Sequence, residues 1–157
     1  MRRLLTLGVG CAIAVSSATG VEAARGCQVS KLSPIKGRTS FNVGTSRLAV
    51  SLPENATFVV GRGRALLEQD GSIRFKLGWL SPSGGPRGFP NGGPLVTGRR
   101  LDRSAAPLRV KMGVKSFALG SGEFYPSSLN FPTAGCWRLS ARNADARLSV
   151  IVRVVEE

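Results

Sequence analysis

Apolar residues recur at every second position in several segments of this chain, and this spacing constrains the fold more than any other feature of the sequence. In 73–79 the alternating residues are Ile, Phe, Leu and Trp, and in 148–154 they are Leu, Val, Val and Val. Successive side chains of a β-strand point to opposite faces, whereas a helix repeats its apolar residues every three or four positions. Similar alternation or short apolar runs occur at 48–52, 57–60, 95–97, 108–112 and 137–141. We therefore predict an all-β fold.

Turn-forming residues separate these candidate strands. They occur at 53–55, 69–71 and 143–145, where the sequences are Pro-Glu-Asn, Gln-Asp-Gly and Asn-Ala-Asp. Such residues favour tight turns between strands, and short strands at this spacing predict an antiparallel sandwich or barrel in one domain. The segment 81–94 contains two Gly-Gly-Pro sequences. We predict that it is an exposed, mobile loop.

The N-terminal segment has the order of a secretory signal peptide. Arg2 and Arg3 precede an apolar run at 4–15, and small residues then lead to Ala23, as in segments that signal peptidase cleaves. The run is about twelve residues long, whereas a membrane-spanning helix needs about twenty. We therefore predict a signal peptide over 1–23 and a secreted or periplasmic domain over 24–157.

Two other export signals have weaker support in the sequence. Arg2-Arg3 could belong to a twin-arginine signal, but the flanking residues do not fit that motif. Cys11 could be the acylated cysteine of a lipoprotein, but a glycine stands where a leucine is expected.

Three cysteines are present, and Cys11 would leave with the signal peptide. Cys27 and Cys136 then remain, one near each end of the domain. Exported proteins keep their disulfides, and the domain offers neither cysteine another partner. We predict a Cys27–Cys136 disulfide.

The domain is strongly basic. The chain has 22 Lys and Arg against 9 Asp and Glu, a formal net charge of +13. Loss of Arg2, Arg3 and Glu22 with the signal peptide leaves about +12. If the apolar set of each strand faces the core, the intervening residues face water. These intervening basic residues are Arg74, Lys76, Arg109, Lys111, Arg138, Arg142, Arg147 and Arg153.

Several kinds of enzyme chemistry lack their residues. The chain has no histidine, which excludes Ser–His and Cys–His catalysis and histidine-ligated zinc. Ser33 and Lys36 match the Ser-x-x-Lys spacing of penicillin-recognising enzymes, but the downstream elements are missing. We predict no catalytic residues, no metal ion and no cofactor, since no cofactor motif is present. Hydrolysis by a pair of carboxylates remains an alternative. The acidic residues of the predicted domain are Glu54, Glu68, Asp70, Asp102, Glu123, Asp145, Glu156 and Glu157.

The aromatic residues are few. Trp79 and Trp137 fall at the apolar positions of their strands, so we predict that both pack in the core. Phe89, Phe124 and Tyr125 are candidates for exposed contacts.

Two segments carry a resemblance to a known family. Gly98-Arg-Arg-Leu-Asp102 is followed by Pro132-Thr-Ala-Gly-Cys-Trp137, and a Cys27-Gln-Val-Ser segment opens the domain. In this order the chain resembles an uncharacterised family of exported bacterial proteins with an immunoglobulin-like β-sandwich. The resemblance implies export and this fold, and it implies no activity. The segments 81–94 and 113–126 depart from it.

Arg99, Arg100 and Asp102 have two interpretations. They could form a charged recognition site at a strand end, or an Arg–Asp pair that fixes the loop at 101–107. Charge-assisted pairs of this kind are common structural devices, so we favour the second interpretation.

Charge, export and missing catalytic motifs together favour a non-enzymatic binding or interaction module with cationic sheet faces. Its partner would be an anionic surface polymer, lipid head groups or an acidic protein. Nucleic acid also fits the charge and stays an alternative, but export disfavours it as the physiological target. The alternatives are a structural or accessory envelope domain and a small carboxylate-dependent hydrolase. The candidate binding residues are Arg138, Arg142, Arg147 and Arg153 of one predicted hairpin, with Arg99 and Arg100.

Cleavage after Ala23 is testable by mass spectrometry of the exported protein. The expected N terminus is Ala24, because Val21 and Ala23 occupy the small-residue positions that signal peptidase reads. An N terminus at Met1, or an acylated Cys11, would contradict the assignment.

Overall fold

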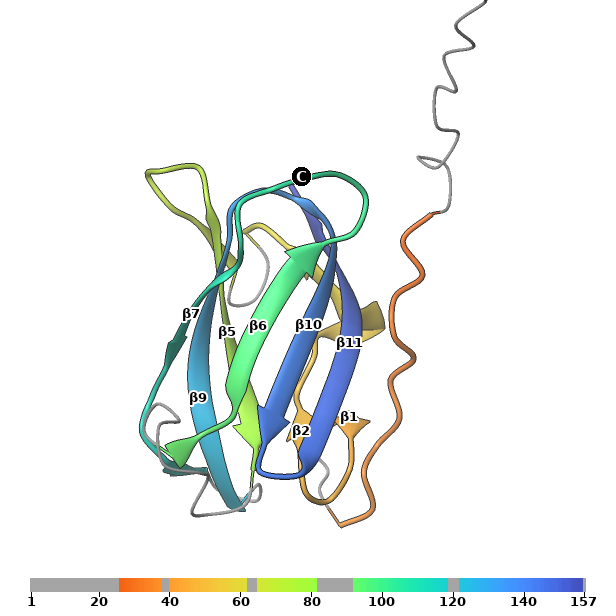
Figure 1. Cartoon of the computed structure of the whole chain (residues 1–157), viewed down its shortest axis with the longest axis vertical. Helices are drawn as coiled ribbons and strands as arrows, with labels where there is room; N and C mark the ends of the chain where they lie inside the picture. Colours follow the sequence, from red (N-terminus) through yellow and green to blue (C-terminus); the bar gives the residue numbers. More distant parts are fainter. Residues whose placement is uncertain (1–25, 38–39, 62–64, 82–91, 119–121, 157) are drawn as a thin grey trace, which may run out of the picture.

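Two β-sheets pack face to face in the computed structural model (Figure 1), which describes residues 26–37, 40–61, 65–81, 92–118 and 122–156. One sheet consists of β3 (Thr57–Val59), β11 (Ala146–Val155), β10 (Gly135–Asn143) and β6 (Leu95–Arg100), in this order. The other has the order β1 (Val43–Gly44), β2 (Ala49–Val50), β5 (Ile73–Leu80), β9 (Gly122–Phe131) and β7 (Arg109–Met112). In addition, β4 (Ala65–Leu67) pairs with β5, and β8 (Ser116–Ala118) pairs with β9.

The strand pairs are antiparallel, apart from the parallel pair β3–β11. A short 3-10 turn, η1 (Glu54–Ala56), precedes β3. The predicted all-β sandwich is therefore confirmed. In the described part of the chain, no helix has the length and apolar character of a membrane span.

The core lies between the sheets, on the apolar positions that the sequence predicts. The four alternating residues of β5 are at most 7% exposed, and Trp79 and Trp137 are fully buried. Aromatic pairs join the two sheets: the rings of Phe58 and Phe75 lie 4.1 Å apart, and those of Phe131 and Trp137 lie 5.5 Å apart, edge to face. Such pairs add about 0.5–1.5 kcal/mol each beyond their buried area. The prediction that both tryptophans belong to the core is confirmed.

β9 is among the longest strands, and alternation did not predict it. Its inward positions include Ser127 as well as Tyr125 and Leu129. The indole N–H of Trp79 donates a hydrogen bond of 2.8 Å to the Ser127 hydroxyl. The serine is therefore satisfied inside the core, and its polar character hides the strand from the apolar pattern.

β10 and β11 form a long hairpin whose turn is Ala144-Asp145. Ala144 has φ of +48°, and two-residue turns with positive φ match the twist of paired strands. The predicted turn at 143–145 is thus confirmed.

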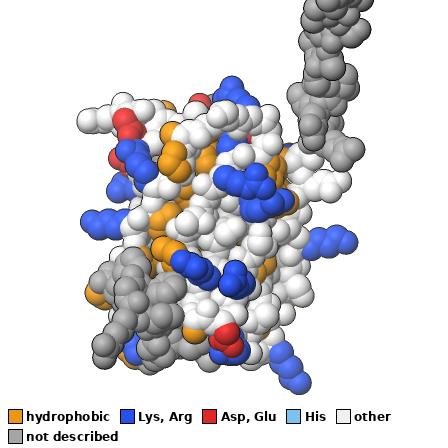
Figure 2. Space-filling view, viewed as in Figure 1, with side chains coloured by type: hydrophobic (Ala, Val, Ile, Leu, Met, Phe, Trp, Pro, Cys, Tyr) orange, Lys and Arg blue, Asp and Glu red, His pale blue; other side chains and the backbone are white. Residues whose placement is uncertain are grey.

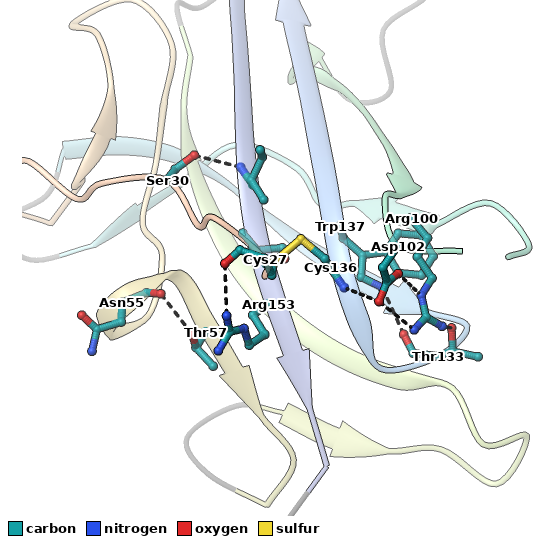
Figure 3. The surroundings of a disulfide bond; sticks show 12 residues. Cys27, Ser30, Asn55, Thr57, Arg100, Asp102, Thr133, Cys136, Trp137 and Arg153 are labelled. Atoms are coloured by element: carbon teal, nitrogen blue, oxygen red, sulfur yellow. Dashed lines mark hydrogen bonds and ion pairs between the residues drawn. A yellow bond between two sulfur atoms is a disulfide. The ribbon is translucent and has the colours of Figure 1, made fainter. Parts of the chain in front are cut away.

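A disulfide fastens the start of the domain to the four-stranded sheet (Figure 3). Cys27 and Cys136, 109 positions apart in sequence, are bonded with their Cα atoms 5.5 Å apart. The segment that begins at Gly26, orange in Figure 1, also bonds to β11: the Ser30 N–H donates to the Ile151 carbonyl at 2.9 Å, and the Ile151 N–H donates to the Ser30 hydroxyl at 2.8 Å. The predicted Cys27–Cys136 pairing is confirmed.

Two sequence predictions concern residues outside the described ranges. The signal peptide falls within 1–25, and most of the predicted loop falls within 82–91. Both stay predictions.

Removal of the disulfide should lower the melting temperature by several degrees or more. Closure of so long a loop contributes up to about 4–5 kcal/mol in the chain-entropy model. Calorimetry of a Cys27→Ser/Cys136→Ser variant measures the loss, and wild-type protein in reductant should match it. Two maleimide-reactive thiols in unreduced exported protein would contradict the bond.

Candidate functional site

Five arginines share the outer face of the four-stranded sheet, and we call this surface the arginine face. Its members are Arg99 on β6, Arg138 and Arg142 on β10, and Arg147 and Arg153 on β11. Arg138 is half-buried and the other four are exposed. Figure 2 looks onto this face and shows two groups of Lys and Arg side chains over its middle, with uncharged surface between them, and further Lys and Arg side chains at the outline of the molecule.

The strand register places four of these arginines directly opposite one another on adjacent strands, in two pairs. Arg142 lies directly opposite Arg147, and Arg138 lies opposite Arg99. Arg153 lies opposite Cys136 and donates a hydrogen bond of 3.1 Å to the Cys27 carbonyl. The structure thus brings together five of the six candidate binding residues.

The sixth candidate, Arg100, points away from the arginine face. Its side chain is only 6% exposed, and Nε lies 2.6 Å from Asp102 Oδ1. A second guanidinium N–H donates to the Thr133 hydroxyl at 2.6 Å, as Figure 3 shows. The Cys136 N–H donates to Asp102 at 3.4 Å. Arg100 and Asp102 therefore form the structural pair that the sequence analysis favoured, and this pair holds Cys136 in place.

Only a glycine fits at position 135, beside the Arg100–Asp102 pair. Its φ is +142°, and an added Cβ would overlap the Arg100 guanidinium. The segments 98–102 and 132–137, which carry the family resemblance, are therefore packed against each other at one corner of the sheet.

Two of the four outward basic residues of the other sheet have acidic partners, whereas Lys76 and Lys111 are exposed and form no ion pair within the described residues. Arg74 pairs with Glu68 and Arg109 pairs with Asp70, each at 2.7 Å. Hydrogen bonds from Ser72, followed by the one from Arg109, hold the pKa of Asp70 well below its usual range. Two of the outward cations predicted for this sheet are thus neutralised locally.

The strands of the arginine face contain no such partner. β3, β6, β10 and β11 include no Asp or Glu. Within the described residues, Arg99, Arg138 and Arg147 form no ion pair. Within the described residues, the arginine face therefore has more cations without an acidic partner than the other sheet, where only Lys76 and Lys111 form no ion pair among the outward cations, and the sequence alone did not indicate this difference.

A row of hydroxyl side chains crosses the arginine face. Ser140 lies opposite Thr97 on one side and Ser149 on the other, and all three are exposed. The surface is hollowed along this row, in a depression of about 580 Å³ that Arg142 and Arg147 also line. The sequence analysis missed this row, although the outward parity of the three residues was a signal for it.

The aromatic candidates have different outcomes. The prediction for Tyr125 is wrong: it is 2% exposed, because its ring packs so closely on Gly93 that an added Cβ there would lie 2.8 Å away. Phe124 is half-buried against the small cluster around Leu80. Phe89 lies outside the described residues.

Four of the described acidic residues, Glu68, Asp70, Asp102 and Asp145, are held in ion pairs with arginines. Besides Asp70, the pKa of Asp102 is lowered chiefly by its hydrogen bond from Arg100, and that of Asp145 by its bond from Arg47. Glu54 and Glu156 are exposed. No group of His, Cys, Asp and Glu among the described residues could hold a metal ion.

Comparison with known proteins gives no match: no family model fits the chain, and no curated protein resembles it significantly.

The substitution Asp102→Asn should destabilise the domain by about 1–2 kcal/mol at neutral pH, because Arg100 loses its counter-ion. The loss stays below that of a fully buried pair, since the carboxylate is 43% exposed. The folded pKa of Asp102 lies below the ordinary value of 3.8, so its contribution is present above about pH 4 and is lost as the pH falls. Thermal melting from about pH 2 to pH 7 measures both effects.

Asp145→Asn is the matched control. Asp145 also pairs with an arginine, but the Arg47 and Asp145 side chains are 60% and 66% exposed, and such surface pairs contribute little. Equal losses in the two variants would refute a structural role for the Arg100–Asp102 pair.

Proposed function

We propose that the protein is an exported, non-enzymatic binding module that docks on an anionic partner through the arginine face. The observation that carries this proposal is the gathering of five arginines on one sheet face whose strands contain no acidic residue. Like charges directly opposite each other destabilise a sheet, and Arg99 and Arg138, which form no ion pair within the described residues, are such a pair. An anionic partner offsets this repulsion.

Arginine suits this role chemically. Its planar guanidinium donates two parallel hydrogen bonds to a carboxylate, sulfate or phosphate. Arg99 and Arg147 are exposed and form no ion pair within the described residues, so their donors are accessible to a ligand. Both lie on regular strands, which hold the side chains at fixed spacing.

Export is part of the proposal, and two features support it. The first 23 residues have the order of a signal peptide, and the domain has a disulfide, which persists in oxidising compartments. The partners that an exported basic surface meets are anionic surface polymers, lipid head groups and acidic proteins.

An immunoglobulin-like topology is also proposed. In such domains strands B, E and D form one sheet and C, F and G the other. The order β5-β9-β7 facing β6-β10-β11 supports this correspondence. One feature differs: the disulfide joins β10 to the segment before the first strand, rather than linking the two sheets.

The binding face is testable with two variants of equal charge. Arg99→Gln/Arg147→Gln removes two cations from the arginine face, and Lys76→Gln/Lys111→Gln removes two exposed cations from the other sheet. The arginine variant should bind heparin about ten- to thirtyfold more weakly at low salt, because each basic residue near an anionic surface contributes about 1 kcal/mol. Its salt dependence, as the slope of log K against log[salt], should fall by about two.

The lysine variant is the control for net charge. It should retain most of the wild-type affinity, with circular dichroism showing that both variants fold. Equal weakening by the two variants would place the binding elsewhere, and no salt-sensitive binding by the wild type would leave the charge as a solubility feature.

A further inference from the structure

We infer that the ligand of the arginine face is an extended acidic polysaccharide, which lies along the hydroxyl row between two rows of arginine. The inference rests on the proposed function, because it names the ligand class of the same surface. It is carried by the register of the four-stranded sheet and by the hollow along the row.

The hydroxyl row consists of Thr97, Ser140 and Ser149 on three adjacent strands. All three side chains are exposed, and none has a hydrogen-bond partner among the residues that the structure describes. Adjacent strands lie about 4.8 Å apart, so the row spans about 10 Å across the sheet. A serine or threonine hydroxyl both donates and accepts, and three of them therefore face solvent as a line of uncommitted hydrogen-bonding groups.

Arginines border the row on both sides. Arg142 and Arg147 occupy the next outward positions toward the hairpin turn, and Arg138 and Arg99 occupy those on the other side. Outward positions repeat every two residues, or about 6.8 Å along a strand. The two arginine rows are therefore about 14 Å apart, with only small side chains between them. The hollow of about 580 Å³ lies on the hairpin-turn side of the hydroxyl row, where Leu95, Arg142 and Arg147 line it together with the row.

An acidic polysaccharide matches both parts of this surface. Its ring hydroxyls recur along the chain and can bond the hydroxyl row, while its carboxylate or sulfate groups project sideways to the arginines. A chain lying across the strands would meet Thr97, Ser140 and Ser149 in turn, with arginine on either side.

Lipid head groups and nucleic acid match less of the surface. Proteins that lie on membranes insert apolar side chains. Among the residues that the structure describes, the exposed large hydrophobic ones are Leu66, Leu67, Val114 and Phe117, all outside the four-stranded sheet. Nucleic-acid strands stack bases on aromatic rings. The aromatic residues of this sheet, Phe58 and Trp137, are fully buried. The face offers arginine and hydroxyl groups, with the half-buried side chains of Leu95 and Ile151 beside them and no aromatic ring among its described residues.

A variant with unchanged net charge can distinguish recognition of a polysaccharide from simple attraction between opposite charges. Thr97→Val/Ser140→Val/Ser149→Val removes the hydroxyl row and keeps every arginine, and valine suits exposed strand positions. The probes are a heparin-derived oligosaccharide, inorganic polyphosphate, and vesicles of mixed phosphatidylglycerol and phosphatidylcholine. The variant should bind the oligosaccharide about tenfold or more weakly, and its affinity for polyphosphate should change less than twofold.

Ser128→Val is the matched control for hydroxyl loss. Ser128 lies opposite both Lys76 and Lys111 on the other sheet, so it repeats a hydroxyl between cations away from the arginine face. This control should bind all three probes as the wild type does, and melting curves should show that both variants fold.

The outcomes distinguish the two proposals. Equal binding of the oligosaccharide by wild type and triple variant, with binding still lost in Arg99→Gln/Arg147→Gln, would overturn the polysaccharide and leave the anion-binding function. Tighter binding to vesicles or polyphosphate than to the oligosaccharide at equal charge would also overturn it. Failure of the wild type to bind any of the three probes would overturn both.

Discussion

Burial of the inner face of the four-stranded sheet is the constraint on which the arginine face depends. Trp137, Leu139, Val150 and Val152 are at most 1% exposed, and their neighbours in sequence must point outward because side chains alternate along a strand. A shift of one residue in the β10–β11 register would turn these apolar side chains to water and bring arginines inward. The core therefore fixes the positions of the outward cations as firmly as it fixes its own packing.

One corner of the sheet shows how closely structural and surface roles adjoin. Arg99 and Arg100 are neighbours in sequence on β6, yet Arg99 faces solvent and Arg100 is buried in its bonds to Asp102 and Thr133. The buried arginine holds the backbone beside Cys136, and the disulfide from Cys136 holds the N-terminal segment against β11. Two adjacent arginines thus have different roles: Arg100 forms buried bonds that stabilise the fold, and Arg99 is exposed on the arginine face.

The sequence predicted the strands whose inward positions are all apolar, and it failed where that pattern is broken. β5, β10 and β11 were predicted from alternation, whereas Ser127 disguised β9 because its hydroxyl is satisfied by Trp79. Outward parity gave the candidate arginines. It could not show that Arg74 and Arg109 have acidic partners, because ion pairs depend on which loops meet in space. The hydroxyl row likewise becomes visible only when the cross-strand register is known.

The arginine face has more cations without an acidic partner than the other sheet, where Lys76 and Lys111 also form no ion pair within the described residues, and this difference supports the proposal that it meets a ligand. Charge kept only for solubility could lie anywhere on the surface, and pairing with carboxylates would then be no disadvantage. The Cα atoms of directly opposite residues lie about 5 Å apart, less than the screening length of about 8 Å at physiological salt, so salt does not fully screen the charges of Arg99 and Arg138 from each other. Glu68 and Asp70 compensate Arg74 and Arg109 on the other sheet, whereas Arg99, Arg138 and Arg147 form no ion pair within the described residues, and the proposed role of the arginine face uses these three cations.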